Sequence, residues 1–157
     1  MDNDIEYIKE LMAQYKADIE PLMKYLPWLR EATAASAMTM YRGESMGEGS
    51  LAFPVYDSTL MSFIKVANDS ALIDRNYPYV YTRKRITTPA QERDIIVACD
   101  YKSWDVLKGI FSRYVLGGRT KGVLWSQGVS EQIFCLVLEK MQEIVTEWDA
   151  ERNLSDK

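Results

Sequence analysis

Residues 130–148 read SEQIFCLVLEKMQEIVTEW and predict a helix with an extended apolar face. Its apolar residues recur at spacings of three and four, so they lie on one side of the helix. Ser130 can cap the start. The inward residues are Ile133, Phe134, Val137, Leu138, Met141, Ile144, Val145 and Trp148. This segment favours a mainly α fold.

The same spacing recurs through most of the chain that precedes this helix. Asp57 or Ser58 can cap a helix, Thr88-Pro89-Ala90-Gln91 is a typical helix start, and Gly117-Gly118 is a typical stop. Pro27 either kinks the helix before it or begins a new one. Helices are predicted at about 4–19, from 21, from 27 to about 40, at 59–68, at 89–98 and from either Asp100 or Ser103 to 116, with a short turn at 123–125. We therefore predict a compact bundle of about six or seven helices.

One small two-stranded β element is also predicted, near 51–56 and 77–82. Residues 51–56 form a short apolar run, but Pro54 limits it to an edge strand. Residues 77–82 are rich in aromatic and β-branched side chains. They form either the strand that pairs with 51–56 or an aromatic loop packed on the helices.

Length and composition predict one helical domain, residues 1–150, followed by a frayed tail at 151–157. No stretch approaches the roughly 20 apolar residues of a membrane span, so no membrane partner is expected. The N-terminus is acidic rather than basic and then apolar, so a cytoplasmic location is expected. Cys99 and Cys135 lie within apolar runs and are interpreted as reduced core thiols.

The chain contains no histidine, which argues against several kinds of catalysis. Residues 43–47 match the G-x-S-x-G motif of hydrolases, but no imidazole is present to activate Ser45, and the surrounding glycines favour a flexible loop. Asp94, Asp100 and Asp105 do not share one helical face, so no metal site is expected. We predict a protein that is not an enzyme and needs no cofactor.

Charge is unevenly distributed along the chain. Residues 75–121 carry ten basic and four acidic side chains, a net charge of +6, whereas the remainder carries −10. Such asymmetry is explained either by ion pairs between the two parts or by an anionic partner.

The candidate partner- or anion-binding residues come from two basic stretches and the aromatic residues near them. Cations beside aromatic rings can bind phosphates and bases, and the same residue types dominate protein interfaces. The turn at 117–122 also combines glycines with two cations, which suits an anion, although it lacks the order of a Walker motif. The candidates are Arg83, Lys84, Arg85, Arg119, Lys121, Tyr79, Tyr81 and Trp125.

Residues 56–145 resemble an uncharacterised bacterial family found in Gram-positive bacteria and their mobile elements. The resemblance rests on Tyr56-Asp57-Ser58…Phe63, Leu72-Ile73, Trp104…Leu107, the turn Arg119 to Gly122, and Ile133…Leu138-Glu139-Lys140-Met141. Related chains carry an Arg-Phe-Cys-Asp-Gly type turn where this one has Arg119-Thr120-Lys121-Gly122, so its Cys and Asp are missing here. The resemblance implies a helical fold and no assigned activity.

Three functions follow from these patterns. The first is a non-enzymatic protein-interaction protein, an accessory or inhibitory factor of a phage or mobile element, such as an inhibitor of a nucleic-acid-targeting defence system. The second is a nucleic-acid-binding module that uses the basic middle segment. The third is a small-molecule-binding domain lined by the tyrosines. The four tryptophans leave self-association open.

Overall fold

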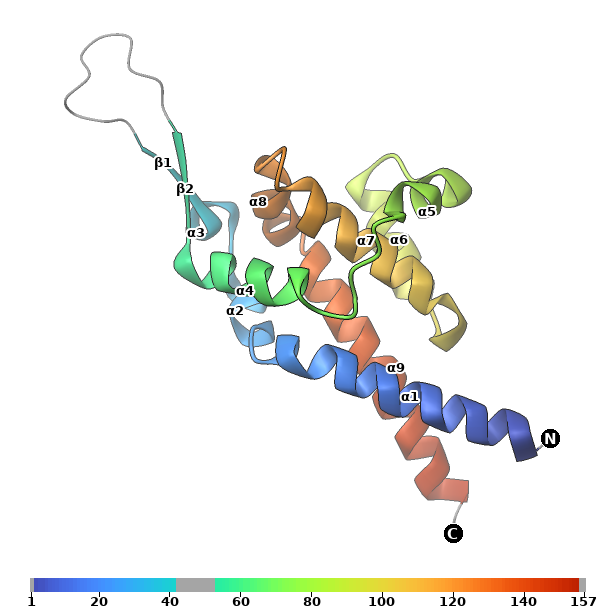
Figure 1. The fold of residues 1–157 in the computed structure, drawn as a ribbon. Coiled ribbons are helices and arrows are strands. Elements are labelled where there is room, and N and C mark those ends of the chain that lie inside the picture. Colours follow the sequence, from blue (N-terminus) through green and yellow to red (C-terminus); the bar gives the residue numbers. More distant parts are fainter. Residues whose placement is uncertain (1, 42–52, 156–157) are drawn as a thin grey trace, which may run out of the picture.

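The computed structural model describes residues 2–41 and 53–155, and it is mainly α with one two-stranded antiparallel sheet (Figure 1). The predicted fold class is therefore confirmed. In chain order, the elements of this part of the protein are α1 (Asp2–Met23), α2 (Leu26–Glu31), α3 (Ala34–Ala37), β1 (Met38–Tyr41), β2 (Phe53–Tyr56), α4 (Ser58–Asn68), α5 (Tyr77–Lys84), α6 (Pro89–Ala98), the 3-10 turn η2 (Tyr101–Ser103), α7 (Trp104–Gly117), α8 (Val123–Ser130) and α9 (Ile133–Ser155).

Helix α9 is the central element of the bundle. It packs against α1, α2, α6, α7 and α8, and Figure 1 shows α1 crossing it. Phe134 on α9 is fully buried, and its ring centroid lies 5.1 Å from that of Phe63 and 5.7 Å from that of Phe111. These three rings from α9, α4 and α7 form the centre of the core, because edge contacts between aromatic rings add to the burial of apolar area.

Two predicted helix starts are confirmed by their hydrogen bonds. The Asp57 carboxylate accepts hydrogen bonds from the backbone N–H groups of Thr59 and Leu60 at the start of α4. Thr88 and Gln91 form the predicted capping box at the start of α6, with Pro89 in the first turn. Both caps act within one turn of the chain, which is why the sequence predicts them.

The first helix is longer than predicted. Pro21 lies inside α1 rather than at the start of a second helix, in the last turn, so the helix ends at Met23. Pro27 lies in the first turn of α2, so it begins a helix there. The expectation that this helix runs to about residue 40 is wrong. Thr33 and Ser36 form a capping box that starts α3, and the chain is extended from Met38.

The predicted partner of the 51–56 strand is also wrong. β2 pairs with β1, with Met38 opposite Tyr56 and Tyr41 opposite Phe53.

Residues 77–84 form helix α5 instead of a strand or an aromatic loop. Pro78 lies in its first turn, and Val80 packs against Gly109 of α7 so closely that a Cβ on Gly109 would lie 2.8 Å from Val80 Cγ2. This long-range contact outweighs the β preference of the aromatic and β-branched side chains.

The C-terminal helices also differ from prediction in their bounds. α8 runs on to Ser130 through Gly128, where a larger residue would not fit because a Cβ would lie 2.5 Å from Phe134 Cε2. Gln132, with φ of 65°, separates α8 from α9, so α9 begins at Ile133 rather than near Ser130. α9 continues to Ser155, into the segment 151–157 predicted as a frayed tail.

The predicted loop from Gly43 to Gly49, with its G-x-S-x-G match, lies outside the described residues. None of the helices within 2–41 and 53–155 is long and apolar enough to cross a membrane.

Candidate functional site

Trp125, one of the predicted interface residues, connects two helices. Its indole Nε1 donates a hydrogen bond to the Val115 carbonyl over 3.0 Å, which ties α8 to the last turns of α7. Gly118 allows this approach, since a Cβ at that position would lie 2.1 Å from Trp125 Cδ1. Trp125 is therefore a half-buried structural support rather than a free binding side chain.

Tyr56 of strand β2 packs against Trp125 and so connects the sheet to α8. The Tyr56 ring meets the Trp125 ring edge to face, with centroids 5.3 Å apart. A Cβ on Gly122 would lie 1.8 Å from the Tyr56 hydroxyl, so only glycine fits under it. Together these contacts hold the turn between α7 and α8 in one position.

Two predicted cations and one further arginine lie at this end of the molecule. Arg119 and Lys121 are exposed on the turn, and Arg119 lines a shallow hollow together with Arg75 and Leu116. None of these three cations forms an ion pair with another described residue. Val123, the first residue of α8 and two residues after Lys121, is 61% exposed. We call Arg75, Arg119, Lys121 and Val123 the basic end.

The other predicted cations lie elsewhere. Arg83, Lys84 and Arg85 are exposed at the C-terminal end of α5. Arg83 forms an ion pair of 2.9 Å with Asp105 in the first turn of α7, whereas Arg119 follows the last turn. The 14 residues of α7 span about 20 Å, so the two predicted basic stretches do not converge.

Arg83 is also the least free of the predicted cations. Its hydrogen bond to Asp105 raises the pKa of the guanidinium above its usual value. The guanidinium lies 5.5 Å from the centroid of the exposed Tyr79 ring, in a cation–π contact. Both Arg83 and Tyr79 are thus engaged within the chain, whereas Lys84 and Arg85 form no ion pair with a residue that the structure describes.

Tyr81 belongs to a different site, which the sequence did not predict. Its hydroxyl donates a hydrogen bond to the carboxylate of Glu92, and the hydroxyl of Tyr114 donates to the other carboxylate oxygen. Arg113 approaches the same carboxylate with its Nη1 at 3.4 Å. Glu92 is only 1% exposed, so α5, α6 and α7 meet around a buried charge that three side chains contact. We call Tyr81, Glu92, Arg113 and Tyr114 the Glu92 cluster.

Burial controls the protonation of the two tyrosines. Two effects raise the pKa of Tyr81 and of Tyr114 above the usual tyrosine range. The larger is the loss of hydration on burial, and the smaller is the hydrogen bond to Glu92. Both side chains therefore stay neutral hydrogen-bond donors. The Arg113 guanidinium lies 5.3 Å and 5.0 Å from the two ring centroids, so it is held between aromatic faces.

A polar cavity of about 180 Å³ opens beside this cluster. Glu92, Tyr81 and Arg113 line it, together with Gln127 of α8 and the segment 86–89. One signal in the sequence could have revealed the Glu92 cluster. Glu92 lies four residues before Ile96 and seven before Cys99, so a charged residue occupies the buried face of α6.

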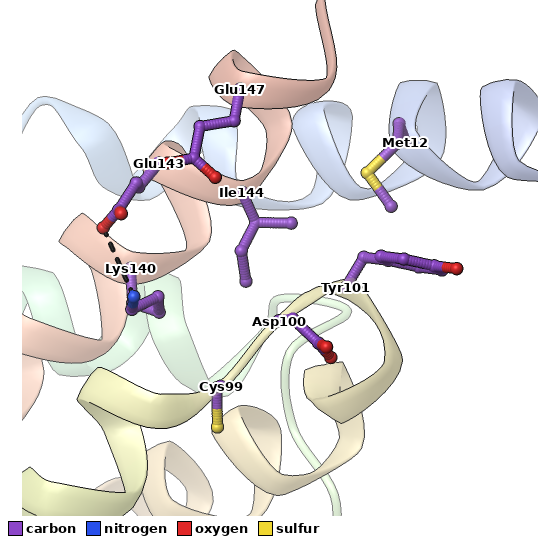
Figure 2. Close-up of a pocket in the computed structure, with 8 residues that line it drawn as sticks. All are labelled: Met12, Cys99, Asp100, Tyr101, Lys140, Glu143, Ile144 and Glu147. Carbon is purple, nitrogen blue, oxygen red and sulfur yellow. Dashed lines mark ion pairs between the residues drawn. The ribbon is translucent and has the colours of Figure 1, made fainter. Parts of the chain in front are cut away.

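A second cavity, of about 240 Å³, lies between α1, η2 and α9 (Figure 2). Its walls carry three carboxylates, Asp100, Glu143 and Glu147, and one ammonium, Lys140, which pairs with Glu143 at 3.4 Å. Met12 and Ile144 contribute apolar surface. Cys99 also lines the cavity, but burial raises the pKa of its thiol to about 11, so the thiolate that a nucleophile requires is scarce near neutral pH.

Within residues 2–41 and 53–155, no group of three or more Cys, Asp and Glu side chains is arranged to hold a metal ion.

Comparison of the chain with protein-family models, curated proteins and solved structures returns no match. The resemblance to the uncharacterised bacterial family therefore stays a prediction.

Proposed function

We propose that this chain is a non-enzymatic protein-interaction protein whose basic end binds an acidic surface of its partner. The observation that carries the proposal is a set of cations, Arg75, Arg119 and Lys121, that have no ion pair among the described residues, with the exposed Val123 two residues after Lys121. Charged groups around an apolar centre match the arrangement of specific protein interfaces.

The rigidity of the basic end supports the proposal. The Trp125 hydrogen bond and the packing of Tyr56 on Trp125 hold the turn before binding, so little conformational entropy is lost when a partner docks.

The distribution of charge favours a protein partner over a nucleic acid. A polyanion is best bound by a continuous stripe of cations, but the two basic stretches are separated by the length of α7, and Arg83 is paired with Asp105. The chain as a whole carries a net charge of −4, which opposes binding of a polyanion.

The finer role that we propose is an accessory or inhibitory factor of a phage or mobile element, acting for example on a nucleic-acid-targeting defence system. It rests on the resemblance of residues 56–145 to the uncharacterised family.

The test places a photo-crosslinking amino acid at Val123 and, as a matched control, at Val97. Val97 is 64% exposed on α6, away from the basic end. We expect a single cross-linked protein from host lysate with the probe at 123 only. Reversing the charges with Arg119→Glu and Lys121→Glu should abolish that adduct.

Two results would overturn the proposal. One is an equal pattern of adducts from positions 123 and 97. The other is salt-sensitive binding to DNA or RNA at about 50 mM salt that is lost in the charge-reversed variant, which would assign the basic end to nucleic acid.

A further inference from the structure

The cavity beside the Glu92 cluster presents a carboxylate and a guanidinium side by side. Glu92 and Arg113 both line it, and their charged groups are 3.4 Å apart. The glutamate is almost fully buried, and hydroxyl groups from two neighbouring helices hold it in place. Such a pair is fixed before any ligand arrives, which is the property of a built site.

Both charged groups retain capacity for hydrogen bonds. A carboxylate accepts about four hydrogen bonds, and that of Glu92 receives three, from Tyr81, Tyr114 and Arg113. A guanidinium carries five N–H donors, of which the Arg113 group directs one to Glu92. Across the cavity, the half-buried Gln127 side chain forms no hydrogen bond to any residue that the structure describes.

We propose that this cavity binds a free α-amino acid. The ligand carboxylate is received by Arg113 and the amide of Gln127, and the ligand ammonium by the remaining acceptor position of Glu92. An α-amino acid carries its two opposite charges on neighbouring groups, which matches the adjacent opposite charges of the site.

Charge and size both restrict the ligand to this class. A simple anion would be repelled by Glu92, and a simple cation by Arg113, whereas a zwitterion is attracted by both. The cavity of about 180 Å³ has room for several water molecules, which suits a small amino acid.

The first experiment titrates each of the common L-amino acids, to about 10 mM, into the full chain labelled with ¹⁵N. We expect at least one to shift the side-chain amide signal of Gln127 and the backbone signals of Thr87 and Thr88 in a saturable manner, with a Kd below about 1 mM. The matched carboxylic acid without the amine, and the matched amine without the carboxylate, should each bind at least tenfold more weakly.

The second experiment repeats the titration with variants. Gln127→Ala should weaken binding at least fivefold with an unchanged fold, since the side chain has no hydrogen bond to lose among the described residues. Arg113→Lys should weaken it further. Gln142→Ala, exposed on α9, is the matched control and should bind like the unmodified chain.

Three results would overturn the proposal. The first is the absence of a saturable shift with every amino acid tested. The second is equal affinity for the amino acid and its amine-free acid, and the third is equal affinity in Gln127→Ala.

Discussion

Glu92 places a carboxylate in the interior of a helical bundle, where an isolated charge would cost several kcal/mol. The hydroxyl groups of Tyr81 and Tyr114 and the guanidinium of Arg113 offset that cost by replacing the lost water. Because the three donors come from α5 and α7 while Glu92 comes from α6, one residue holds three helices together.

Removing one of these donors should measurably destabilise the protein. We expect Tyr114→Phe to lower the free energy of unfolding by about 1.5–3 kcal/mol, the usual contribution of a hydrogen bond to a charged group. Chemical denaturation followed by circular dichroism provides the measurement. Tyr7→Phe, at a side chain 64% exposed on α1, is the control and should change stability by less than about 0.5 kcal/mol.

The two cysteines should be unreactive near neutral pH. Burial raises the pKa of the Cys99 thiol to about 11. Burial, together with a hydrogen bond to Glu139, raises the pKa of the Cys135 thiol to about 12. Since only the thiolate reacts, alkylation of the folded chain should stay slow up to about pH 9 and accelerate only as the pH approaches 11. Mass spectrometry after timed iodoacetamide treatment measures this. Rapid labelling at pH 7.5 without unfolding would contradict the assignment of both as core thiols.

At the scale of elements, the position of α8 depends on the fit between Gly122 and Tyr56. Gly122→Ala should destabilise the chain by about 1–3 kcal/mol, because the new Cβ would meet the Tyr56 hydroxyl, 1.8 Å from its ideal position. Adding Tyr56→Phe removes that hydroxyl, and the nearest remaining ring atom lies at 3.0 Å. Thermal unfolding should therefore show a lowered Tm in Gly122→Ala and a largely restored Tm in the double variant.

Tyr56→Phe alone is the control for this pair and should leave the Tm nearly unchanged. If the double variant were no more stable than Gly122→Ala, the contact with Tyr56 would not be the reason for glycine at this position.

The helices that the sequence predicts well are those whose first residues are set by capping side chains close by in the chain. Asp57 and Thr88 accept hydrogen bonds from backbone N–H groups within one turn, and Pro89 suits the first turn of a helix, so α4 and α6 begin where the pattern indicates. α5 was misassigned because its side chains prefer strands in isolation. Its helical state is favoured by the packing of Val80 on Gly109, residues that are 29 positions apart in sequence.

At the scale of the whole molecule, the buried rings of Phe63, Phe111 and Phe134 form the centre of the hydrophobic core. Phe134→Ala should cost about 3–5 kcal/mol, because the ring contacts side chains of α4 and α7 and its removal leaves a cavity between three helices. The midpoint of unfolding in guanidinium chloride should fall. The transitions followed by circular dichroism and by tryptophan fluorescence should still coincide. Val97→Ala, at an exposed site, should not shift the midpoint.

Charge is also a property of the whole molecule rather than of its segments. Within the basic middle, Arg83 pairs with Asp105, Arg113 with Glu92, and Arg93 with Glu131. Of these pairs only Arg93–Glu131 joins the basic middle to the rest of the chain, so ion pairs among the described residues account for little of the asymmetry seen in the sequence. The predicted binding cations without such a pair fall into two groups, Lys84 and Arg85 next to the Arg83–Asp105 pair and Arg119 and Lys121 after the last turn of α7, so they do not form a continuous anion-binding surface.

The amino-acid sequence by itself determined the helical class, the apolar face of α9 and the caps of α4 and α6, because these depend on side chains within a few residues of one another. Only the tertiary structure decided that residues 77–84 are helical, that residues 38–41 supply the second strand, and that Glu92 is buried against two tyrosines and an arginine. The physical reason is that each of these depends on contacts between elements distant in sequence, whose energies exceed local preferences only when the helices are packed together.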